Sequence, residues 1–344
     1  MASIRMDVDK GLELIKRNTV EIITEKELKT ALDEGRQMSA YIGRATTGSI
    51  HLGHLIPLSK LVDFQKAGIS TKVLLADVHS VLDDQKSKWE DLDLRVEYTR
   101  KCIELAFDWE KQPEFVRGSD YQIKSDYILD VLKMSTIATV DRATRAASEV
   151  TRMKNPKVSE LIYPIMQALD EEYLDVDIQL GGIDQRHIFA FAREYMPALG
   201  YRSRIEVMTP LVASIRGPGT KMSSSVPESN IKIYDSEEAI RRKINSAYCP
   251  EGMTHDNLLL QLVGFFILPA EGKFKIYRDA KFGGDLEITN YSELEALFSE
   301  KKLHPADLKK AVADYLVERF KFARKYFEGN LDLLNQLGKE FLPS

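Results

Sequence analysis

The chain has 344 residues, of which 44% are hydrophobic and 29% charged, and its formal net charge is −5. That length allows two domains with a sizeable core, and the negative charge excludes a protein that coats nucleic acid through overall basicity, so an RNA partner would need a local basic patch. Two cysteines, Cys102 and Cys249, are too few for a disulfide framework or a four-cysteine zinc site.

The N-terminal end predicts a chain that stays in the cytoplasm. Residues 1–11 are charged and lack the apolar core of a secretory signal, and no stretch approaches the roughly 18 apolar residues of a membrane span. Residues 7–35 then show helical spacing, with a possible capping box of Thr24 and Glu27 and an end at Gly35.

Strands and helices alternate over the following segment. We expect strands at 39–43, 71–82 and 113–120 and helices at 51–68 and 91–109. Gly68 is placed to close the first of these helices. The strand–helix–strand–helix–strand order predicts a right-handed parallel α/β sheet.

A helical region interrupts this alternation from residue 121 to 173, with a break at Asn155-Pro156. It has more apolar positions than one helix face needs, and an internal core could absorb them. These positions are Leu129, Val131, Leu132, Met134, Ile137 and Val140.

The chain then returns to a strand at 175–182 and a helix at 184–196. Residues 216–226 are rich in glycine and serine and have no periodicity. From about residue 235 the pattern is helical, with one glycine-rich loop at 281–285. We therefore expect a domain boundary between residues 226 and 235.

The segment YIGRATTGSIHLGH, residues 41–54, joins the first strand to its helix through a turn of glycines and threonines. Such a turn offers free backbone N–H groups and the helix dipole to an anion, and Gly43 and Gly48 let a ring or phosphate approach the backbone. His51 and His54 share one helix face and could both donate to phosphate oxygens. The alternative is a helix start with two exposed histidines. No carboxylate or cysteine adjoins them in sequence, so we expect no metal site.

The segment RGPGTKMSSS, residues 216–225, places Lys221 and three serines on a loop after Gly217, Pro218 and Gly219. One lysine with several hydroxyls on a mobile loop suits a clamp that closes on a triphosphate as charge develops. The alternative is a phosphorylatable linker.

The helix predicted within residues 159–177 has a polar face. Tyr163, Gln167 and Asp170 are spaced at i, i+4 and i+7, while leucines and isoleucines point in other directions and can pack into the core. The polar face could be solvent-exposed, or it could bind a small ligand. A buried Asp170 would need a hydrogen-bond donor to offset its desolvation, and a phenolic hydroxyl is a suitable one.

HLGH and KMSSS, about 170 residues apart in an α/β chain, resemble the two signatures of class I aminoacyl-tRNA synthetases, which adenylate an amino acid with ATP and pass it to tRNA. Two positions depart from the family pattern: Leu52 stands where the family has isoleucine, and Ser224 where it has lysine. Neither change removes a histidine or Lys221, but Ser224 leaves one phosphate-contacting charge unsupplied.

Further motifs resemble the tyrosyl-tRNA synthetases of the archaeal and eukaryotic cytoplasmic type. They run from about residue 15 to 325: YIGRATTGSIHLGH, LLADVH, GSDYQ, YPIMQALDEEYLDVDIQLGGIDQR, KMSSS, KFGGD and LHPADLK. The resemblance implies a Rossmann-type parallel-sheet catalytic domain over residues 1–230 with a helical insertion at about 121–160. A mainly helical anticodon-recognition domain would follow over 231–344.

The resemblance also implies a tyrosine pocket and an ATP site. Tyr41 and Asp170 would both bond the phenolic hydroxyl of tyrosine. The other implied tyrosine contacts are Tyr163, Gln167 and Gln185 at the α-amino group with Gln122 nearby, and Leu74, Ala76 and His79 around the ring. The implied ATP contacts are Gly43, His51, His54, Gly182, Asp184 and Met222, with Lys221, Ser223 and Ser224 clamping the phosphates, which bring Mg²⁺.

Three residues of the C-terminal part could read single-stranded RNA: Phe282 on its glycine-flanked loop, and His304 and Asp307 among lysines. HPADLKK is equally an ordinary capped helix start with Pro305 at N1. The resemblance implies that Phe282 and Asp307 contact the first anticodon base.

Basic residues of the N-terminal part are implied contacts of the acceptor stem. Arg186 would contact its first base pair, with Arg142 or Arg145 as weaker candidates. The implied partners are tRNA(Tyr), L-tyrosine, ATP and a second copy of the chain bound through the helical insertion, without membrane or DNA.

Two alternatives remain open at this point. The tryptophanyl-tRNA synthetases share both ATP signatures, although Tyr41 with Asp170 favours a phenol. A non-catalytic synthetase-like protein that binds RNA or signals is the other, although it has no evident need for His51, His54 and Lys221 together.

Overall fold

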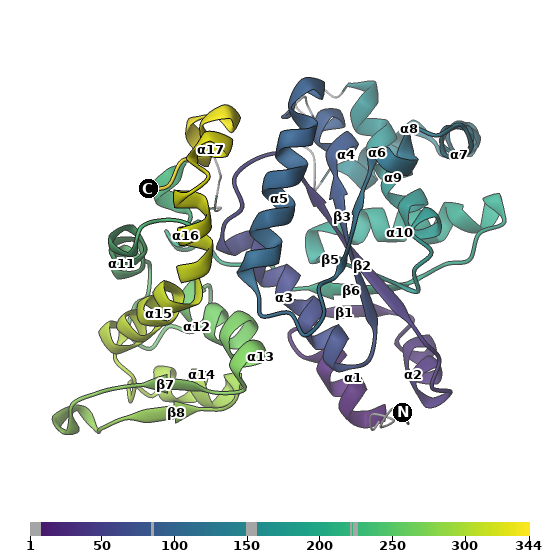
Figure 1. The fold of residues 1–344 in the computed structure, drawn as a ribbon. Coiled ribbons are helices and arrows are strands. Elements are labelled where there is room, and N and C mark those ends of the chain that lie inside the picture. The colour runs from purple at the N-terminus through teal and green to yellow at the C-terminus, as the bar shows by residue number, and fades with distance from the viewer. Residues whose placement is uncertain (1–7, 84–85, 149–156, 221, 223–225) are drawn as a thin grey trace. The chain divides into compact units, whose positions relative to one another are not determined.

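The computed structural model describes residues 8–83, 86–148, 157–220, 222 and 226–344 (Figure 1). The chain forms two compact units, each assembled from separate stretches of sequence. The first takes residues up to 47, 63–100 and 110–211, and the second takes 48–62, 101–109 and 212–344. The HLGH turn thus belongs to the same compact unit as the C-terminal helices. The functional boundary expected at residues 230/231 does not coincide with this division and stays a prediction.

The strands of the described residues form a six-stranded sheet and a separate two-stranded one. They are β1 (Glu21–Ile23), β2 (Ser39–Ala45), β3 (Ser70–Ala76), β4 (Glu114–Arg117), β5 (Ile178–Gly182), β6 (Ile205–Thr209), β7 (Phe274–Ile276) and β8 (Leu286–Ile288). The large sheet, in the first unit, has the order β1-β6-β5-β2-β3-β4. Its last five members are mutually parallel and β1 is antiparallel to β6. The prediction of a parallel α/β sheet is confirmed, with an antiparallel edge strand that it did not include.

The helices of the first unit, and those shared by both units, follow the strands in alternation. They are α1 (Val8–Lys16), α2 (Glu25–Asp33), α3 (Leu52–Lys66), α4 (Asp77–Leu82), α5 (Leu92–Ala106), α6 (Ser119–Gln122), α7 (Ser125–Ile137), α8 (Val140–Ala147), α9 (Val158–Tyr173) and α10 (Arg186–Tyr195). Gly68 has φ +77°, a left-handed conformation that ends the chain's helical path after α3, as predicted.

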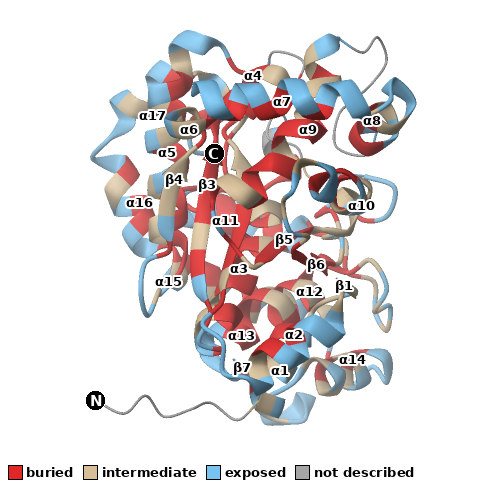
Figure 2. Cartoon of the chain, turned by 90° about the vertical axis from the view of Figure 1, so that its right-hand side faces the viewer, coloured by how far each residue is buried: buried red, intermediate tan, exposed pale blue. Residues whose placement is uncertain are grey.

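The strand order reverses between β2 and β5, because β3 and β4 extend the sheet on one side and β5 and β6 on the other. In open α/β sheets, ligands bind outside the carboxyl ends of the strands at such a switch point. β3, β5 and β6 are mostly buried, and red predominates in them in Figure 2. Side chains at the ends of β2, β3 and β5 are therefore the first place to look for a site.

Two local predictions in the N-terminal half are wrong. Thr24 has φ 66°, and its hydroxyl donates to the Ile23 carbonyl over 2.6 Å, so α2 begins without the expected side-chain cap. The strand expected over 71–82 ends at Ala76. There Asp77 accepts a hydrogen bond from the backbone N–H of Val78 (2.9 Å), and the chain turns into α4.

The helical region after residue 121 divides its apolar side chains between two environments. Val131 and Met134 are buried in a cluster with residues of α9 and α10. The side chains of Leu129, Leu132, Ile137 and Val140 are 43–66% exposed (Figure 2). The internal core thus buries only some of the six apolar side chains named above, and α7 has an exposed apolar face. The predicted break at Asn155-Pro156 lies outside the described residues.

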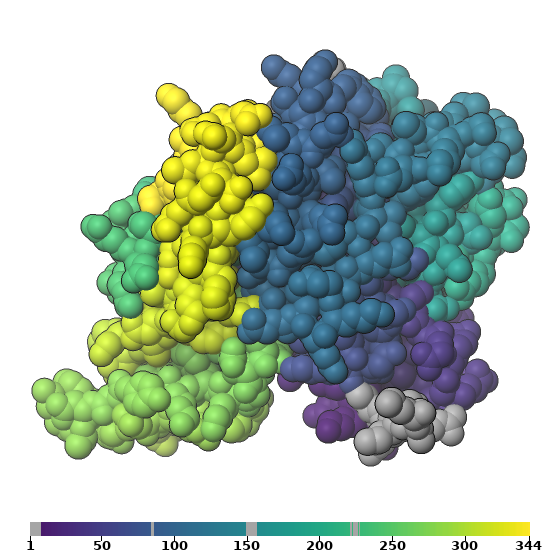
Figure 3. Space-filling model, viewed as in Figure 1, coloured from purple at the N-terminus to yellow at the C-terminus, as the bar shows by residue number. Residues whose placement is uncertain are grey.

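The second unit is mainly helical, as predicted. Its helices are α11 (Glu237–Ser246), α12 (Leu258–Leu262), α13 (Leu268–Glu271), α14 (Tyr291–Ser299), α15 (Pro305–Arg319), α16 (Lys321–Glu328) and α17 (Leu331–Leu337). The sequence pattern missed the β7–β8 hairpin, drawn in light green in Figures 1 and 3, because its three-residue strands contain too little alternation. Within the described residues, no helix has the length and apolar run needed to cross a membrane.

Candidate active site

A small pocket in the first unit lies at the switch point of the sheet. It is lined by side chains from the ends of β2 and β3, from α4 and α9, and from the turn after β5. These residues are Tyr41, Gly43, Ala45, Leu74, Ala76, His79, Tyr163, Gln167, Asp170 and Gln185. All of these residues except Ala45 are predicted site residues, Gly43 as a contact of ATP and the others as contacts of tyrosine.

Asp170 lies at the base of this pocket and is fully buried. Its Oδ1 accepts three hydrogen bonds, from the hydroxyls of Tyr121 (2.7 Å) and Tyr127 (2.9 Å) and from Nε2 of Gln122 (2.8 Å). Its Oδ2 has no hydrogen-bond partner among the described residues. A buried carboxylate oxygen in this state is costly until a donor reaches it.

Burial raises the pKa of Asp170 to about 7, and the hydrogen bonds from Gln122, Tyr121 and Tyr127 oppose that rise. A phenolic hydroxyl was the hydrogen-bond donor predicted for Asp170. Two residues of the protein, Tyr121 and Tyr127, already supply such a donor. Both were missed as site residues, because Asp170 lies more than 40 positions away and spacing says nothing of such contacts.

Tyr41 is the second polar group at the base of the pocket. Its hydroxyl accepts a hydrogen bond from Nε2 of Gln179 over 2.7 Å, and both side chains are buried. Burial, together with the negative charges of Asp170 and Glu171, raises the pKa of Tyr41 well above its usual value. Tyr41 therefore stays a neutral phenol that retains a proton to donate.

His79 forms one wall of the pocket and is uncharged at neutral pH, because burial lowers its pKa to about 4. Its ring meets the Tyr163 ring edge-on at 4.7 Å, and its Nδ1 lies 3.3 Å from Nε2 of Gln122. His79 Nε2 and Asp170 Oδ2 lie 3.8 Å apart, too far for a good hydrogen bond. His79 thus contributes shape to the pocket without adding a positive charge.

The mouth of the pocket carries amides. Gln167 donates through Nε2 to Oε1 of Gln185 over 2.9 Å, and both side chains are partly exposed. Gln122, expected near them, instead lies behind the pocket, where it is fully buried and bonded to Asp170. The pocket is therefore buried and acidic at its base and polar but uncharged at its mouth.

Asp77 holds the segment that supports Asp170. Its carboxylate accepts hydrogen bonds from the backbone N–H (2.9 Å) and hydroxyl (2.7 Å) of Ser119 and from Nε of Arg117 (2.7 Å). A Cβ at Gly118 would lie 2.5 Å from Oε1 of Gln122, so only glycine allows this close approach. Asp77 thus fixes the turn that carries Tyr121 and Gln122 to Asp170.

The turn after β5 brings two residues predicted to bind the nucleotide, Gly182 and Asp184, next to Gln185 of this pocket. Gly182 ends β5, and Asp184 and Gln185 follow in a single 3₁₀ turn. A Cβ at Gly182 would lie 2.4 Å from Oδ1 of Asp184. Because Gly182 has no side chain, the Asp184 carboxylate can lie close to the backbone at the end of β5.

In the second unit, the HLGH turn brings its two histidines together. The His51 and His54 rings stack with centroids 3.7 Å apart, and His51 is buried. Leu52 N–H donates to the Ile231 carbonyl over 3.0 Å, and a Cβ at Gly53 would lie 2.6 Å from Cε of Met222. The HLGH turn therefore lies against Met222 of the second signature, as the prediction of one nucleotide site requires. Lys221, Ser223 and Ser224 lie outside the described residues.

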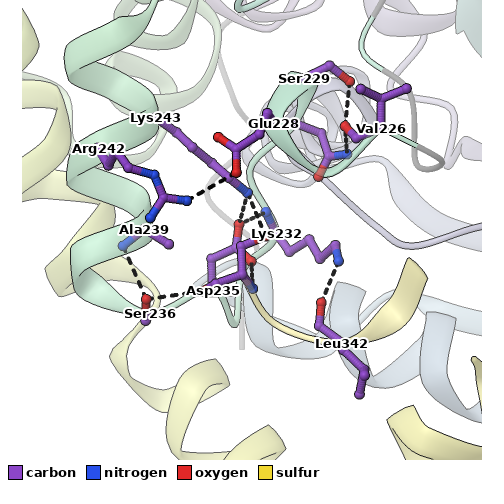
Figure 4. A network of polar contacts seen from close by, with 12 residues as sticks. Val226, Glu228, Ser229, Lys232, Asp235, Ser236, Ala239, Arg242, Lys243 and Leu342 are labelled. Carbon is purple, nitrogen blue, oxygen red and sulfur yellow. Dashed lines mark hydrogen bonds and ion pairs between the residues drawn. The ribbon is translucent and has the colours of Figure 1, made fainter. Parts of the chain in front are cut away.

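A buried ion pair anchors the chain just after the second signature (Figure 4). Lys243 Nζ lies 2.7 Å from Oδ2 of Asp235, with both side chains fully buried, and it also donates to the Ser344 hydroxyl (2.9 Å). The Ser344 N–H donates to Oδ1 of Asp235 (2.8 Å), and Lys232 Nζ donates to the Leu342 carbonyl (2.6 Å). Because Lys232 pairs with His51 in a β-bridge, this network also supports the HLGH turn.

The β7–β8 loop exposes the predicted base-stacking residue. Phe282 is 60% exposed, ends a short 3₁₀ turn (Ala280–Phe282) and is followed by Gly283 and Gly284, both at positive φ. Arg278 ties this loop to the segment before α15 by donating to the Lys302 carbonyl over 2.8 Å.

The start of α15 is a capped helix terminus, which was the alternative reading of HPADLKK. His304 Nδ1 accepts from the Ala306 N–H (3.1 Å), Pro305 is at N1, and Asp307 lies in the first turn. A structural role therefore accounts for His304, whereas Asp307 is only partly buried.

The three arginines predicted to contact tRNA lie on the first unit. Arg186 makes a two-pronged ion pair with Glu21, at 2.7 and 3.0 Å, that leaves half of its side chain exposed. Arg142 pairs with Glu194, and Arg145 is exposed.

Comparison with known proteins agrees with the fold. Residues 33–321 match the family described as tRNA synthetases class I (W and Y). The chain is 45% identical to the tyrosine–tRNA ligase of Archaeoglobus fulgidus, over 93% of this chain and 98% of that protein. It is 41% identical to the cytoplasmic tyrosine–tRNA ligase of Danio rerio, covering 94% of this chain and 62% of that one.

Solved structures give the same result. The crystal structure of the A. fulgidus tyrosyl-tRNA synthetase complexed with L-tyrosine matches with a TM-score of 0.88 at 44% identity, covering 93% of this chain and 99% of that one. A tryptophanyl-tRNA synthetase from Aeropyrum pernix matches at 0.71 with 15% identity, over 97% of this chain and 91% of that one, which reflects the fold alone. The fold and the family match define a class I aminoacyl-tRNA synthetase. Within that class, the chain belongs to the tyrosyl-tRNA synthetases of archaeal and eukaryotic cytoplasmic type.

Proposed function

We propose that the chain is a tyrosine–tRNA ligase that activates L-tyrosine with ATP and transfers it to tRNA(Tyr). The observation that carries this proposal is Oδ2 of Asp170, a buried acceptor without a partner among the described residues, at the base of a pocket walled by aromatic rings. A para-hydroxyl is the substrate group that such an acceptor needs. The A. fulgidus and D. rerio relatives carry the same activity in their names.

The residues of the pocket divide between the two ends of the substrate. Asp170 accepts the phenolic proton and Tyr41 donates to the phenolic oxygen, while Leu74, Ala76 and His79 enclose the ring. At the mouth, Tyr163, Gln167 and Gln185 hold the α-amino group, and Gln122 keeps Asp170 in place. An indole N–H is displaced from the para position and does not match this arrangement, which argues against tryptophan.

ATP binds as its magnesium complex, with Mg²⁺ carried on the phosphates. Gly43, Gly182 and Asp184 contact the nucleoside part, beside the tyrosine carboxylate. His51 and His54 act at the phosphates together with Met222 and with Lys221, Ser223 and Ser224 of the loop. The contact between Met222 and the HLGH turn supports a shared role for the two signatures.

Activation requires no protein nucleophile. A tyrosine carboxylate oxygen attacks the α-phosphorus of ATP in line, the bond to the β-phosphate oxygen breaks, and pyrophosphate leaves. The protein orients the reactants and donates hydrogen bonds to the phosphate oxygens as charge develops. A ribose hydroxyl of the terminal adenosine of tRNA then attacks the activated carbonyl, and AMP leaves.

The uncovered face of α7 supports a homodimer. Ile128, Leu129 and Leu132 of this helix, with Ile123 just before it, are 42–62% exposed. Exposed apolar side chains grouped on one helix are typical of an interaction surface. We assign this face to a second copy of the chain, and we place the dimer in the cytoplasm, where the D. rerio relative is named to act.

The second unit recognises the anticodon and the first unit the acceptor stem. Phe282 offers an exposed ring for stacking on a base, and Asp307 offers a carboxylate to its edge. The link between Arg278 and the Lys302 carbonyl holds these two elements close together. Arg186 is assigned to the first base pair of the acceptor stem, for which it must exchange its ion pair with Glu21.

ATP–pyrophosphate exchange with single amino acids tests this function. We expect exchange with tyrosine and far weaker exchange with tryptophan and phenylalanine. A preference for tryptophan would assign the chain to the sister enzyme. Absence of exchange with all twenty amino acids would leave a non-catalytic RNA-binding protein.

A further inference from the structure

We propose that Gln179 is a positioning residue that sets the direction of the hydrogen bond between Tyr41 and the substrate, and so favours a phenol over an aniline. This inference rests on the proposed function. Gln179 of β5 is the direct cross-strand neighbour of Tyr41 of β2, and its Nε2 donates to the Tyr41 hydroxyl over 2.7 Å. Both side chains are at most 2% exposed, so no water competes for this contact.

The surroundings of Gln179 leave its amide hydrogens to Tyr41. The next neighbour in the row across the sheet is Glu206 of β6, which is buried and is close enough to the buried Glu171 of α9 to be affected by its charge. Burial is the main cause that raises the pKa of both glutamates, to about 8 for Glu171. The charge of Asp170 adds to the rise at Glu171 and that of Glu171 to the rise at Glu206, while Arg193 and Arg204 oppose both. The carboxyl oxygens of both glutamates have no hydrogen-bond partner among the described residues, so neither draws the Gln179 amide away from Tyr41.

The hydrogen bonds that link Gln179, Tyr41, the substrate hydroxyl and Asp170 all run in one direction, because each group donates to the next. An ionised Asp170 can only accept hydrogen bonds, and its Oδ1 already accepts from three donors. Its Oδ2 therefore accepts a hydrogen bond from the substrate hydroxyl. The substrate oxygen then needs a donor from the other side. Tyr41 can supply that donor because its own oxygen accepts from Gln179, which turns its proton toward the pocket. The order is Gln179 to Tyr41 to substrate to Asp170.

An aniline cannot complete this chain. 4-Aminophenylalanine has nearly the shape of tyrosine, but its nitrogen carries two hydrogens and is a poor acceptor. One N–H of the amine can donate to Asp170. The second N–H points at the Tyr41 hydroxyl proton, which the hydrogen bond from Gln179 keeps directed into the pocket, so two donors face each other. Removing the Gln179 amide lets the Tyr41 hydroxyl turn and accept that N–H. The structure thus assigns to Gln179 a share of the selectivity against amines.

The test is the ratio of kcat/KM for tyrosine to kcat/KM for 4-aminophenylalanine in ATP–pyrophosphate exchange. Gln179→Met keeps the volume and removes the donor, and Gln179→Leu is a second variant in case the first folds poorly. Both substrates are measured on the same preparation, so a loss of active protein cancels in the ratio. Leu180→Met is the control, because the next residue of the strand points to the opposite face of the sheet.

We expect the wild type to prefer tyrosine, the ratio to fall about tenfold in both Gln179 variants, as the loss of one buried hydrogen bond implies, and no change in Leu180→Met. An unchanged ratio in both Gln179 variants would overturn the inference. A wild type that prefers the amine would overturn it too, since Tyr41 would then donate to Gln179. Absence of exchange with tyrosine in the wild type would instead refute the proposed function.

Discussion

The Tyr127 hydroxyl donates to Oδ1 of Asp170 over 2.9 Å, whereas Oδ2 of the same carboxylate has no hydrogen-bond partner in the part of the chain that the structure describes. Tyr127 is itself fully buried, and its single hydroxyl proton is shared between Asp170 and the Met166 carbonyl of α9, which lies at 2.7 Å. One side of the carboxylate is therefore fixed by the protein. The other side is available only to a group that enters the pocket.

Tyrosine binding should depend on pH through Asp170. Its pKa is raised to about 7 in the empty pocket, and only the ionised form can accept the phenolic proton. We expect the KM for tyrosine to rise as the pH falls below 7, by roughly tenfold per unit. His79, with a pKa of about 4, does not titrate in this range. Steady-state exchange between pH 5.5 and 8.5 measures this dependence.

Two controls assign the titration. Phenylalanine has no hydroxyl for Asp170, so its KM should stay flat over the same range. Glu171 also titrates, near pH 8, so Glu171→Gln should keep the step below pH 7 and Asp170→Asn should remove it. A step that survives in Asp170→Asn would assign the proton to another group.

The ligand-free protein should show the opposite dependence in stability. The pKa of Asp170 is higher folded than unfolded, so protonation favours the folded chain. This contribution is complete below about pH 4 and is lost as the pH rises through about 7. Urea unfolding of wild type and Asp170→Asn without tyrosine measures it, and the difference between the two proteins should change with pH in that window.

Breaking the buried pair of Lys243 and Asp235 should destabilise the protein. Lys243→Met leaves an unpaired buried carboxylate, which costs about 3–5 kcal/mol. The double variant Lys243→Met/Asp235→Asn removes that charge and should recover a large part of the loss in urea unfolding. Because this network supports His51, the KM for ATP should rise in the single variant. Equal stability of the two variants would show that the charge is not the cause.

Asp307→Arg should impair the charging of tRNA and leave tyrosine-dependent pyrophosphate exchange unchanged, because Asp307 belongs to the predicted anticodon site. Glu318→Arg makes the same charge change on an exposed position of the same helix, α15, and should have little effect. Parallel loss of charging and exchange in Asp307→Arg would refute the separation of the two functions.

The apolar face of α7 should hold the dimer together. Leu132 is 59% exposed, and Leu132→Glu would place a charge within the proposed interface. We expect sedimentation to show a dimer for the wild type and a monomer for this variant. Leu331→Glu, at an exposed leucine of α17, is the matched control and should remain dimeric. A monomeric wild type would refute the assignment of this face.

The sequence predicted those parts of the site that share one periodic element. Tyr163, Gln167 and Asp170 lie on one face of α9 by spacing alone, and the structure places all three around the same pocket. The resemblance added Tyr41 and His79, which come from other elements. Spacing could not have joined them to α9, because contacts across the sheet depend on its strand order.

The residues that support the site from behind could not be predicted in this way. Tyr127 reaches Asp170 from α7, and no local pattern marks it. Gln179 left one signal, a glutamine inside an otherwise apolar strand, but its contact with Tyr41 depends on the register of β2 and β5. The failed cap at Thr24 has a similar cause, since a capping sequence does not fix the backbone angle that the turn imposes.

The most direct test of the pocket is the effect of Asp170→Ala on kcat/KM for tyrosine and for phenylalanine, both measured by pyrophosphate exchange on one preparation. Losing a charged acceptor for the phenolic proton should lower activation of tyrosine by roughly ten- to 150-fold, from about 1.5–3 kcal/mol. Activation of phenylalanine should fall much less, since it has no hydroxyl to lose. Equal losses for the two substrates would contradict the role of Asp170 in binding the hydroxyl.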